Sequence, residues 1–201
     1  MEFEPVRADL FPTPVYAVML PDAAAMNAGL LASIEVERAQ DEKGLEVSNY
    51  VHLGGWHSRT TLHREPDFAG IANAVRQLAR HVSQDLNYAP ERRLDIDAMW
   101  AIVNAPGASN QAHIHPGSLW SGVYYVRARG KAGDIAFIDP RTANLMRQPR
   151  YEKRPEICQT EIRHAPQPGC LLLFPSWLYH LVHPNLSDED RVILSFNLSQ
   201  Y

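Results

Sequence analysis

Residues 110–126 read NQAHIHPGSLWSGVYYV, and this stretch places two histidines directly before a run of strand-forming residues. His113 and His115 are two positions apart, so in an extended chain both imidazoles point to the same face. The run that follows them, SGVYYV, is rich in the β-branched and aromatic residues typical of strands. The pattern predicts two imidazoles beside a strand, aimed at one point.

A second run that carries histidines lies later in the chain. Residues 171–185 read LLLFPSWLYHLVHPN and contain His180 and His183. Arg191 then opens a further strand-like run, which reads VILSFNL over residues 192–198. Two close histidines, one distant histidine and a following arginine suggest a mononuclear metal site with an anchor for an acidic co-substrate. Neutral imidazole suits iron, zinc, copper and nickel, and no cysteine lies nearby to favour a structural zinc site.

The third ligand of this metal site stays open at the level of sequence. Non-heme iron(II) oxygenases usually hold their metal with two histidines and one carboxylate, whereas the residue two places after His113 is His115. The metal would then have three neutral ligands, or two if His115 turns away. Asp134 and Asp139 are the nearest carboxylates after the pair, but their spacing fits turn residues better.

The other histidines are weaker candidates. His183 lies three residues after His180, so an extended chain would place it on the opposite face, and His180 is preferred as the distal ligand. His57 and His63 are lone histidines outside the main set. We expect neither to bind metal, although the segment that carries them could contribute to substrate binding.

Several segments together resemble the 2-oxoglutarate/Fe(II)-dependent dioxygenases, in their uncharacterised bacterial and phage branch. These segments read HIH with SGVYYV, FIDPR, PGCLLLFPSWLYHLVHP and RVILSFN. The N-terminal phrases LFPTPVY and GGWHS also fit, so the resemblance covers nearly the whole chain. It implies an oxidoreductase that uses Fe(II) and 2-oxoglutarate to hydroxylate a small-molecule or peptide substrate, which the sequence does not name.

The resemblance also implies metal ligands. By position, His113 matches the first ligand of the family and His180 matches the distal ligand. His115 stands where the family usually has Asp or Glu, which is a departure from the pattern.

Three further residues are implied as binding 2-oxoglutarate. Arg191 matches the basic residue that pairs with the far carboxylate, and a planar guanidinium can hold a carboxylate through two parallel charge-assisted hydrogen bonds. Ser195 lies four residues on, on the same face of the strand, where it either reaches that carboxylate or caps the strand. Tyr125 matches a position where relatives place a phenol on the co-substrate. Alternation sends one of Tyr124 and Tyr125 inward, and both could also be ordinary strand aromatics.

Composition indicates a soluble globular protein. The chain has 201 residues, of which 45% are hydrophobic and 21% charged, and its net charge of -4 argues against a nucleic-acid surface. Two cysteines do not make a disulfide framework. The start of the chain lacks a signal-peptide stretch, and the apolar runs are too short to span a membrane, so we expect a cytoplasmic protein. A homodimer is left open.

Periodicity and the resemblance together predict a mostly β fold. An edge strand or extended arm is expected over residues 3–18, and helices are expected from Asp22 and over 67–86. From Leu94 the period changes to two, with one alternating set made of Leu94, Ile96, Ala98, Trp100 and Ile102. Loops are expected over 44–55 and 142–154. We predict one oxygenase-like domain over 1–201, a double-stranded β-helix (jelly roll), with an arm and helices over 1–93 packed on one sheet of a core formed by 94–201.

Two other functions fit the same residues. A cupin-like enzyme with three histidine ligands would not use 2-oxoglutarate, and it would have no use for a buried arginine at the start of the last strand. A small-acid binding module would use the pocket without chemistry.

Overall fold

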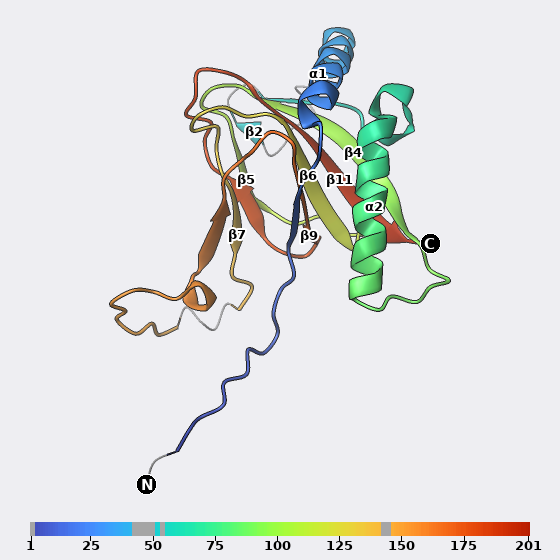
Figure 1. The fold of residues 1–201 in the computed structure, drawn as a ribbon. Helices are drawn as coiled ribbons and strands as arrows, with labels where there is room; N and C mark the ends of the chain where they lie inside the picture. Colours follow the sequence, from blue (N-terminus) through green and yellow to red (C-terminus); the bar gives the residue numbers. More distant parts are fainter. Residues whose placement is uncertain (1–2, 42–50, 53–54, 142–145) are drawn as a thin grey trace.

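The computed structural model describes residues 3–41, 51–52, 55–141 and 146–201. The loop expected over 44–55 lies largely outside these residues, although Val51–His52 form a short strand. The loop expected over 142–154 is confirmed where it is described, over 146–154. The described chain forms two antiparallel sheets and two α-helices (Figure 1). The helices are α1 (Ala23–Gln40) and α2 (Ala69–Asp85), with short 3-10 turns η1 (Leu62–Arg64), η2 (Pro66–Phe68) and η4 (Glu156–Cys158).

The strands divide into a larger and a smaller sheet. The six-stranded sheet has the order β1-β9-β6-β11-β4-β3, and the five-stranded sheet has the order β2-β5-β10-β7-β8. The bounds are β1 (Tyr16–Met19), β2 (Val51–His52), β3 (Trp56–His57), β4 (Leu94–Asn104), β5 (Ser109–His113), β6 (Trp120–Arg127), β7 (Ile135–Ile138), β8 (Glu161–His164), β9 (Cys170–Pro175), β10 (His180–Val182) and β11 (Arg191–Gln200).

The two sheets face each other across an apolar layer. This inner cluster joins Ile135 and Phe137 of the smaller sheet to side chains of the larger one, among them Val123, Leu172 and Ile193. Two facing antiparallel sheets of this kind form a double-stranded β-helix, so the predicted mostly β class is confirmed.

Strand β11 lies in the middle of the larger sheet, between β6 and β4. Its side chains alternate between two apolar layers, as the period of a strand requires. Val192, Leu194, Phe196 and Leu198 belong to the outer cluster, whereas Ile193 belongs to the inner one. The inward positions of β11 are therefore Arg191, Ile193, Ser195 and Asn197, and these positions face the smaller sheet.

The alternation predicted for β4 is interrupted. Leu94 and Ile96 pack in the outer cluster, but Trp100 and Ile102 pack in the inner one. The cause is a β-bulge, since Asn197 of β11 pairs with Ala98 while the next residue, Leu198, pairs with Ile96. One extra residue on a strand exchanges its two faces. The expectation that Leu94 to Ile102 share one face is therefore wrong, although β4 does become fully buried towards its end.

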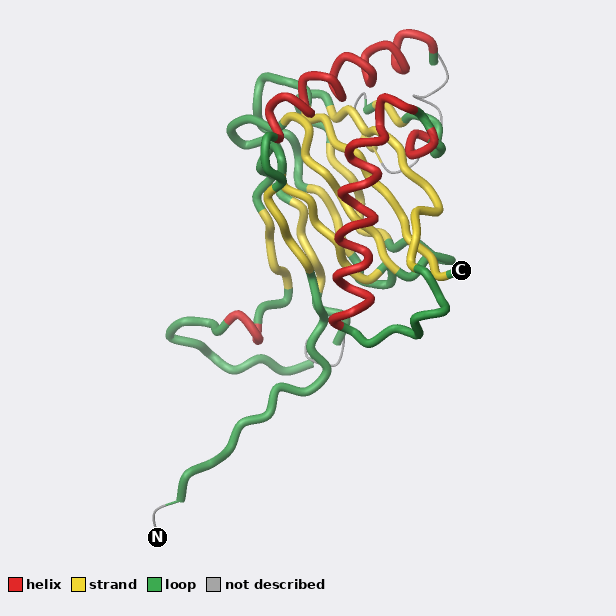
Figure 2. Tube along the Cα trace, turned by 45° about the vertical axis from the view of Figure 1, so that its right-hand side comes forward, coloured by secondary structure: helices red, strands yellow, loops and turns green. Residues whose placement is uncertain are grey.

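Both helices contribute to the outer apolar cluster. From α2 it contains Ile71, Ala72, Val75, Ala79 and Val82, together with side chains of β4, β6, β9 and β11. Figure 2 shows α2 running along one face of the strands. From α1 the cluster contains Leu30 and Ile34, and the Tyr124 hydroxyl of β6 donates to Asn27 Oδ1 at 2.7 Å. Asp22 occupies the N-cap position of α1, but its side chain makes no capping hydrogen bond.

Segments before residue 94 complete the larger sheet. Strand β1 pairs with β9 at one edge, which agrees with the predicted edge strand, and β3 pairs with β4 at the other edge. The chain before β1 extends away from the sheets (Figure 1).

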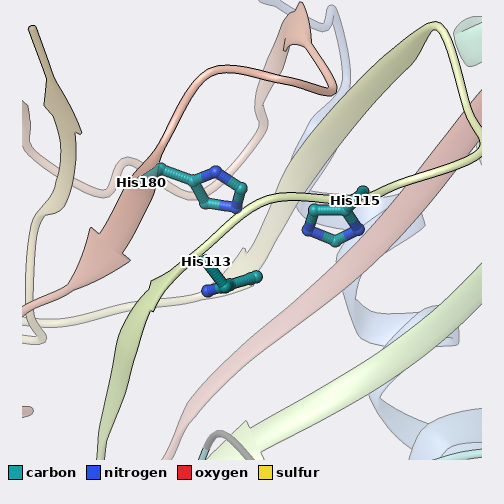
Figure 3. Close-up of side chains that lie close together, drawn as sticks. All are labelled: His113, His115 and His180. Carbon is teal, nitrogen blue, oxygen red and sulfur yellow. The ribbon is translucent and has the colours of Figure 1, made fainter. Parts of the chain in front are cut away.

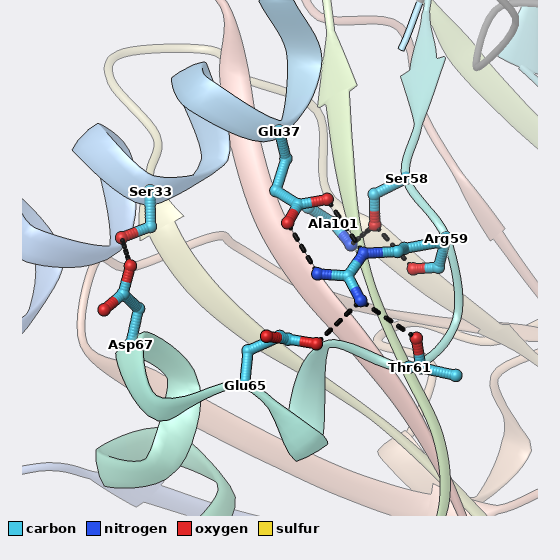
Figure 4. A network of polar contacts seen from close by, with 8 residues as sticks. All are labelled: Ser33, Glu37, Ser58, Arg59, Thr61, Glu65, Asp67 and Ala101. Atoms are coloured by element: carbon cyan, nitrogen blue, oxygen red, sulfur yellow. Dashed lines mark hydrogen bonds and ion pairs between the residues drawn. The ribbon is translucent and has the colours of Figure 1, made fainter. Parts of the chain in front are cut away.

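A polar network links Ser58 and Arg59, which follow β3, to α1 and to β4 (Figure 4). Arg59 donates to both carboxylate oxygens of Glu37, at 3.0 and 2.7 Å, and to Glu65 at 2.8 Å. The buried Ser58 hydroxyl accepts from the backbone N–H of Ala101 at 2.8 Å. These contacts fix the position of His57, the preceding residue, beside β4.

Neither helix of the described chain combines the length and apolar character that crossing a bilayer requires.

Candidate metal centre

Three imidazoles from two neighbouring strand ends converge (Figure 3). His113 ends β5 and lies directly opposite His180, which opens β10. Their ring centroids are 4.3 Å apart, and the His115 ring lies 5.1 Å from His113 and 5.2 Å from His180. One ring nitrogen from each histidine lies within 4.8 Å of the others, which is close enough for all three to share one metal ion.

Backbone carbonyls orient two of these rings. His113 Nδ1 lies 2.7 Å from the carbonyl oxygen of Gln111, and His180 Nδ1 lies 2.9 Å from that of Leu178. A carbonyl can only accept, so each Nδ1 carries the proton, and each Nε2 carries the lone pair of the ring. In both cases the carbonyl belongs to the residue two positions earlier.

The protein environment keeps these histidines neutral. Burial, together with the neighbouring His113, lowers the pKa of His180 to about 3 and that of His115 to about 4. Burial also lowers the pKa of His113 below its ordinary value. Neutral imidazole is the form that binds a metal, so the three rings need not lose protons first.

A cavity of about 330 Å³ adjoins the three histidines, between the two sheets. Its wall is largely apolar, with Trp100, Ile102, Val123, Ile135, Phe174, Val182 and Ile193. Arg191 is the only Asp, Glu, Lys or Arg among the described lining residues. A small anionic ligand therefore meets a single fixed cation here, besides any metal held by the histidines.

Arg191 is buried with its hydrogen-bonding groups unused. Its side chain is 1% exposed, and none of its three guanidinium nitrogens has a hydrogen-bond partner among the described residues. Burial lowers its pKa, and the nearby Tyr125 opposes this shift. An arginine still stays protonated, and a buried cation without a partner is costly. The cost is removed when an anion binds, so the guanidinium fits the carboxylate of a ligand.

The other predicted co-substrate residues lie near Arg191. Ser195 lines the cavity, on the inward face of β11. The ring of Tyr125 is fully buried, with its centroid 5.4 Å from Arg191 Cζ, and its hydroxyl has no hydrogen-bond partner among the described residues. Tyr125 belongs to the inner cluster and Tyr124 to the outer one, so one points inward and one outward, as alternation predicts.

The rival ligands lie outside the cluster. His183 Nε2 lies 3.2 Å from Glu161 Oε1. Asp139 forms an ion pair with Arg141 at 2.9 Å. Among the described residues, the group able to share a metal contains neither of the carboxylates Asp134 and Asp139, and neither lines the cavity.

Two residues at the site had no assigned role in the sequence reasoning. The Trp100 ring stacks near-parallel on His57, at 5.5 Å and 17°, and on His115, at 5.8 Å and 26°. Asn197 also lines the cavity. The period of two along β11, continued from Arg191 and Ser195, could have indicated Asn197.

The comparison with known families agrees with this geometry. Residues 98–197 match the family model described as "Putative 2OG-Fe(II) oxygenase". The chain carries a 2OG-Fe(II) oxygenase domain. This match spans β4 to β11 and includes the three histidines, Arg191, Ser195 and Tyr125. The bacterial and phage branch stays a prediction. No curated protein sequence matches the chain.

Solved structures of this oxygenase domain share its fold. A prolyl-4-hydroxylase from Pseudomonas putida is 18% identical over 93% of this chain and 92% of its own, with a TM-score of 0.66. HygX from Streptomyces hygroscopicus, with nickel and 2-oxoglutarate bound, is 11% identical over 93% and 83%, with a TM-score of 0.57. The viral collagen prolyl hydroxylase of Paramecium Bursaria Chlorella virus-1 is 13% identical over 92% and 94%, with a TM-score of 0.57. At these identities the likeness concerns the fold, and it confirms the jelly roll.

Proposed function

We propose that this protein is an Fe(II)- and 2-oxoglutarate-dependent oxygenase that hydroxylates an organic substrate. One observation carries the proposal: three neutral imidazoles able to share a metal adjoin the same cavity as a buried, unpartnered arginine. A metal-binding face and an anion-binding group are the two requirements for a chelating co-substrate with a free carboxylate at its far end.

In this proposal His113, His115 and His180 hold the iron. Imidazole is a suitable ligand for Fe(II), and three ligands on one side leave positions open for other molecules. The bound metal and 2-oxoglutarate supply the oxidative chemistry. The apolar walls, among them Ile193, Val123 and Phe174, exclude water from the reacting groups.

Arg191 fixes the far carboxylate of 2-oxoglutarate through paired hydrogen bonds from its guanidinium. Ser195 supports it from the same face of β11, and the Tyr125 hydroxyl supports it from β6. All three groups come from the larger sheet, whereas the histidines belong to the smaller sheet and the loop that follows β5. The co-substrate would thus bridge the sheets.

We extend the proposal to the whole chain as one domain. The jelly roll over 94–201 takes β1 and β3 from the N-terminal part as the two edge strands of its larger sheet. The likeness in fold to two prolyl hydroxylases favours a peptide as the substrate class, and a small molecule remains the alternative.

Calorimetry under anaerobic conditions tests the role of Arg191. With Fe(II) bound, Arg191→Met removes the charge at similar volume, and we expect 2-oxoglutarate to bind roughly 100-fold more weakly, since truncating one partner of a buried charge pair costs about 2–5 kcal/mol. Arg191→Lys keeps the charge without the paired geometry, so its affinity for 2-oxoglutarate should lie between those of the wild type and Arg191→Met. Arg127→Met is the matched control, because Arg127 donates to the Asp190 carbonyl oxygen and does not line the cavity.

Turnover separates the alternatives. The proposal expects the Fe(II) protein to convert 2-oxoglutarate to succinate in air. Oxygen uptake without succinate would favour a three-histidine dioxygenase of the cupin type. The absence of both oxygen uptake and succinate would favour a small-acid binding module. Equal binding of 2-oxoglutarate by the wild type and Arg191→Met would contradict the assignment of the anchor.

A further inference from the structure

His115 differs from the other two histidines in where it lies on the backbone. His113 and His180 belong to strands β5 and β10, and the Nδ1 atom of each faces the carbonyl oxygen of the residue two positions earlier. His115 lies beyond the end of β5, and its backbone N–H donates to the Ser176 carbonyl oxygen at 3.0 Å. This bond fixes the main chain, but it does not set the plane of the ring, because the second side-chain torsion of histidine has broad minima. A ring nitrogen can bind a metal only when its ring plane is aimed at the ion.

The ring of His115 packs nearly parallel to the indole of Trp100. The two ring centroids are 5.8 Å apart and the planes differ by 26°, within the range of offset-stacked aromatic pairs. The indole is itself fixed, because Trp100 is 7% exposed and belongs to the inner apolar cluster. A flat surface that cannot move therefore restricts the plane that the His115 ring can adopt.

The β-bulge between β4 and β11 brings Trp100 to this side of the larger sheet. Because the bulge exchanges the two faces of β4, Leu94 and Ile96 pack in the outer cluster and Trp100 packs in the inner one. Bulges next to active sites re-aim side chains in this way. The Nε1 atom of Trp100 is buried and has no hydrogen-bond partner in the described part of the chain. A buried donor without a partner is unfavourable, so the contacts of the wide indole face account for a tryptophan at this position better than packing alone.

His57 braces the indole from a third segment. Its ring centroid lies 5.5 Å from that of Trp100, with 17° between the planes, and its Nδ1 lies 2.7 Å from the Ser58 carbonyl oxygen. The ion pair of Arg59 holds this segment against α1 (Figure 4). The rings of His57, Trp100 and His115 thus form an array that connects a fixed segment before β4 to the loop after β5.

We propose that Trp100, braced by His57, is a positioning residue that sets the plane of the His115 ring and so presents His115 as the third metal ligand. The indole does through its face what the backbone carbonyls do for His113 and His180 through hydrogen bonds. Groups that orient a ligand contribute to metal affinity although they do not touch the ion. This inference rests on the proposed function, because it takes His115 to be a ligand.

Cobalt(II) is a convenient probe, because its visible absorption reports the coordination of the metal. Trp100→Leu removes the indole face, and we expect cobalt to bind about tenfold more weakly, with a spectrum shifted towards that of His115→Ala. Trp100→Phe keeps an aromatic face and should stay within about threefold of the wild type. Trp120→Leu is the matched control, because Trp120 lies in the outer cluster with Tyr16 as its ring neighbour at 5.7 Å. Its cobalt affinity should stay within about twofold of the wild type.

A double-mutant cycle shows whether Trp100 acts through His115. In the His115→Ala background, Trp100→Leu should cause no further loss of cobalt affinity and no further change of the spectrum. The same loss in both backgrounds, or an equal loss in Trp120→Leu, would overturn the proposal and leave the proposed function standing. An unchanged cobalt affinity in His115→Ala would overturn it by removing its premise, and failure of the wild type to bind cobalt would overturn the proposed function as well.

Substitution of His57 gives a second measurement if Trp100→Leu fails to fold, as judged by circular dichroism. His57→Leu removes the brace and leaves Trp100 and His115 unchanged. We expect cobalt to bind about threefold more weakly to this variant, and no more weakly when His115→Ala is also present. His57→Phe keeps a ring against the indole and should restore the affinity. An unchanged affinity in a folded His57→Leu protein would overturn the proposal, because the array would then not set the plane of the ligand.

Discussion

The buried imidazoles of His115 and His180 make the stability of the metal-free protein depend on pH. Their pKa values of about 4 and about 3 lie below the ordinary 6.5. Above pH 6.5 both are neutral in the folded and the unfolded chain. As the pH falls below 6.5, the unfolded chain takes up protons that the folded chain does not, so the free energy of unfolding decreases. Each residue contributes about 1.4 kcal/mol per pH unit, and less for the partly exposed His115.

Urea unfolding at pH 7.5 and pH 5.0, in the presence of a chelator, measures this effect. We expect the wild type to lose about 2 kcal/mol more than His180→Leu between these pH values, because the variant lacks one of the groups that the folded chain keeps neutral. An equal loss in the two proteins would show that His180 is not held neutral by burial.

Individual site residues differed in how far the sequence could indicate them. His113, His180 and Arg191 lie next to strand-like runs at informative spacings, so the sequence alone could bring them together as a hypothesis. Trp100 could not be assigned in this way, because its importance lies in ring contacts with His57 and His115, which come from different segments. Those contacts depend on the distance between strands and not on any motif.

Strand β6 contains a glycine that the packing of the larger sheet requires. A Cβ atom at Gly122 would collide with the Phe196 ring of β11 and with the backbone oxygen of Leu172 in β9. Because the backbone oxygen cannot move aside, we expect Gly122→Ala to lower the free energy of unfolding by about 1–3 kcal/mol, the usual cost of overpacking.

The matched control is Gly29→Ala in helix α1. A Cβ atom at Gly29 meets nothing within 4 Å, so the substitution should stabilise the protein by about 0.5–1 kcal/mol through the better helix propensity of alanine. Urea unfolding of both variants tests the pair. A stable Gly122→Ala protein would show that β6 can separate from its neighbours at little cost.

Elements with a clear period were predicted well, and those set by tertiary contacts were not. The stripe of Ile71, Val75 and Val82 matches the buried face of α2. The bulge in β4 cannot be recognised from the sequence, because the alternation that begins with Leu94, Asp95, Ile96 and Asp97 continues without a break to Ile102. Pairing with β11 decides where the extra residue lies, so an alternating pattern can hide an exchange of faces.

The whole molecule has two apolar layers with different roles. The outer layer joins the helices to the larger sheet, and the inner layer joins the two sheets around the cavity. Every residue proposed to bind metal or 2-oxoglutarate belongs to the inner side. The larger sheet thus carries stability on one face and the ligand site on the other, so the two properties should respond to different substitutions.

Ile71→Ala and Ile193→Ala separate these roles. Ile71 is fully buried in the outer layer, so its truncation should lower the free energy of unfolding by about 2–4 kcal/mol. Its 2-oxoglutarate affinity should stay within about twofold of the wild type, because β11 is undisturbed on its inward side.

Ile193 lies between Arg191 and Ser195 on the cavity wall, and its truncation admits water beside the guanidinium. Since water weakens a buried charge pair, we expect 2-oxoglutarate to bind roughly tenfold more weakly. Calorimetry of folded protein at low temperature makes the affinity measurements on both variants independent of their stability. A comparable loss of affinity in Ile71→Ala would show that the two layers are coupled through the larger sheet.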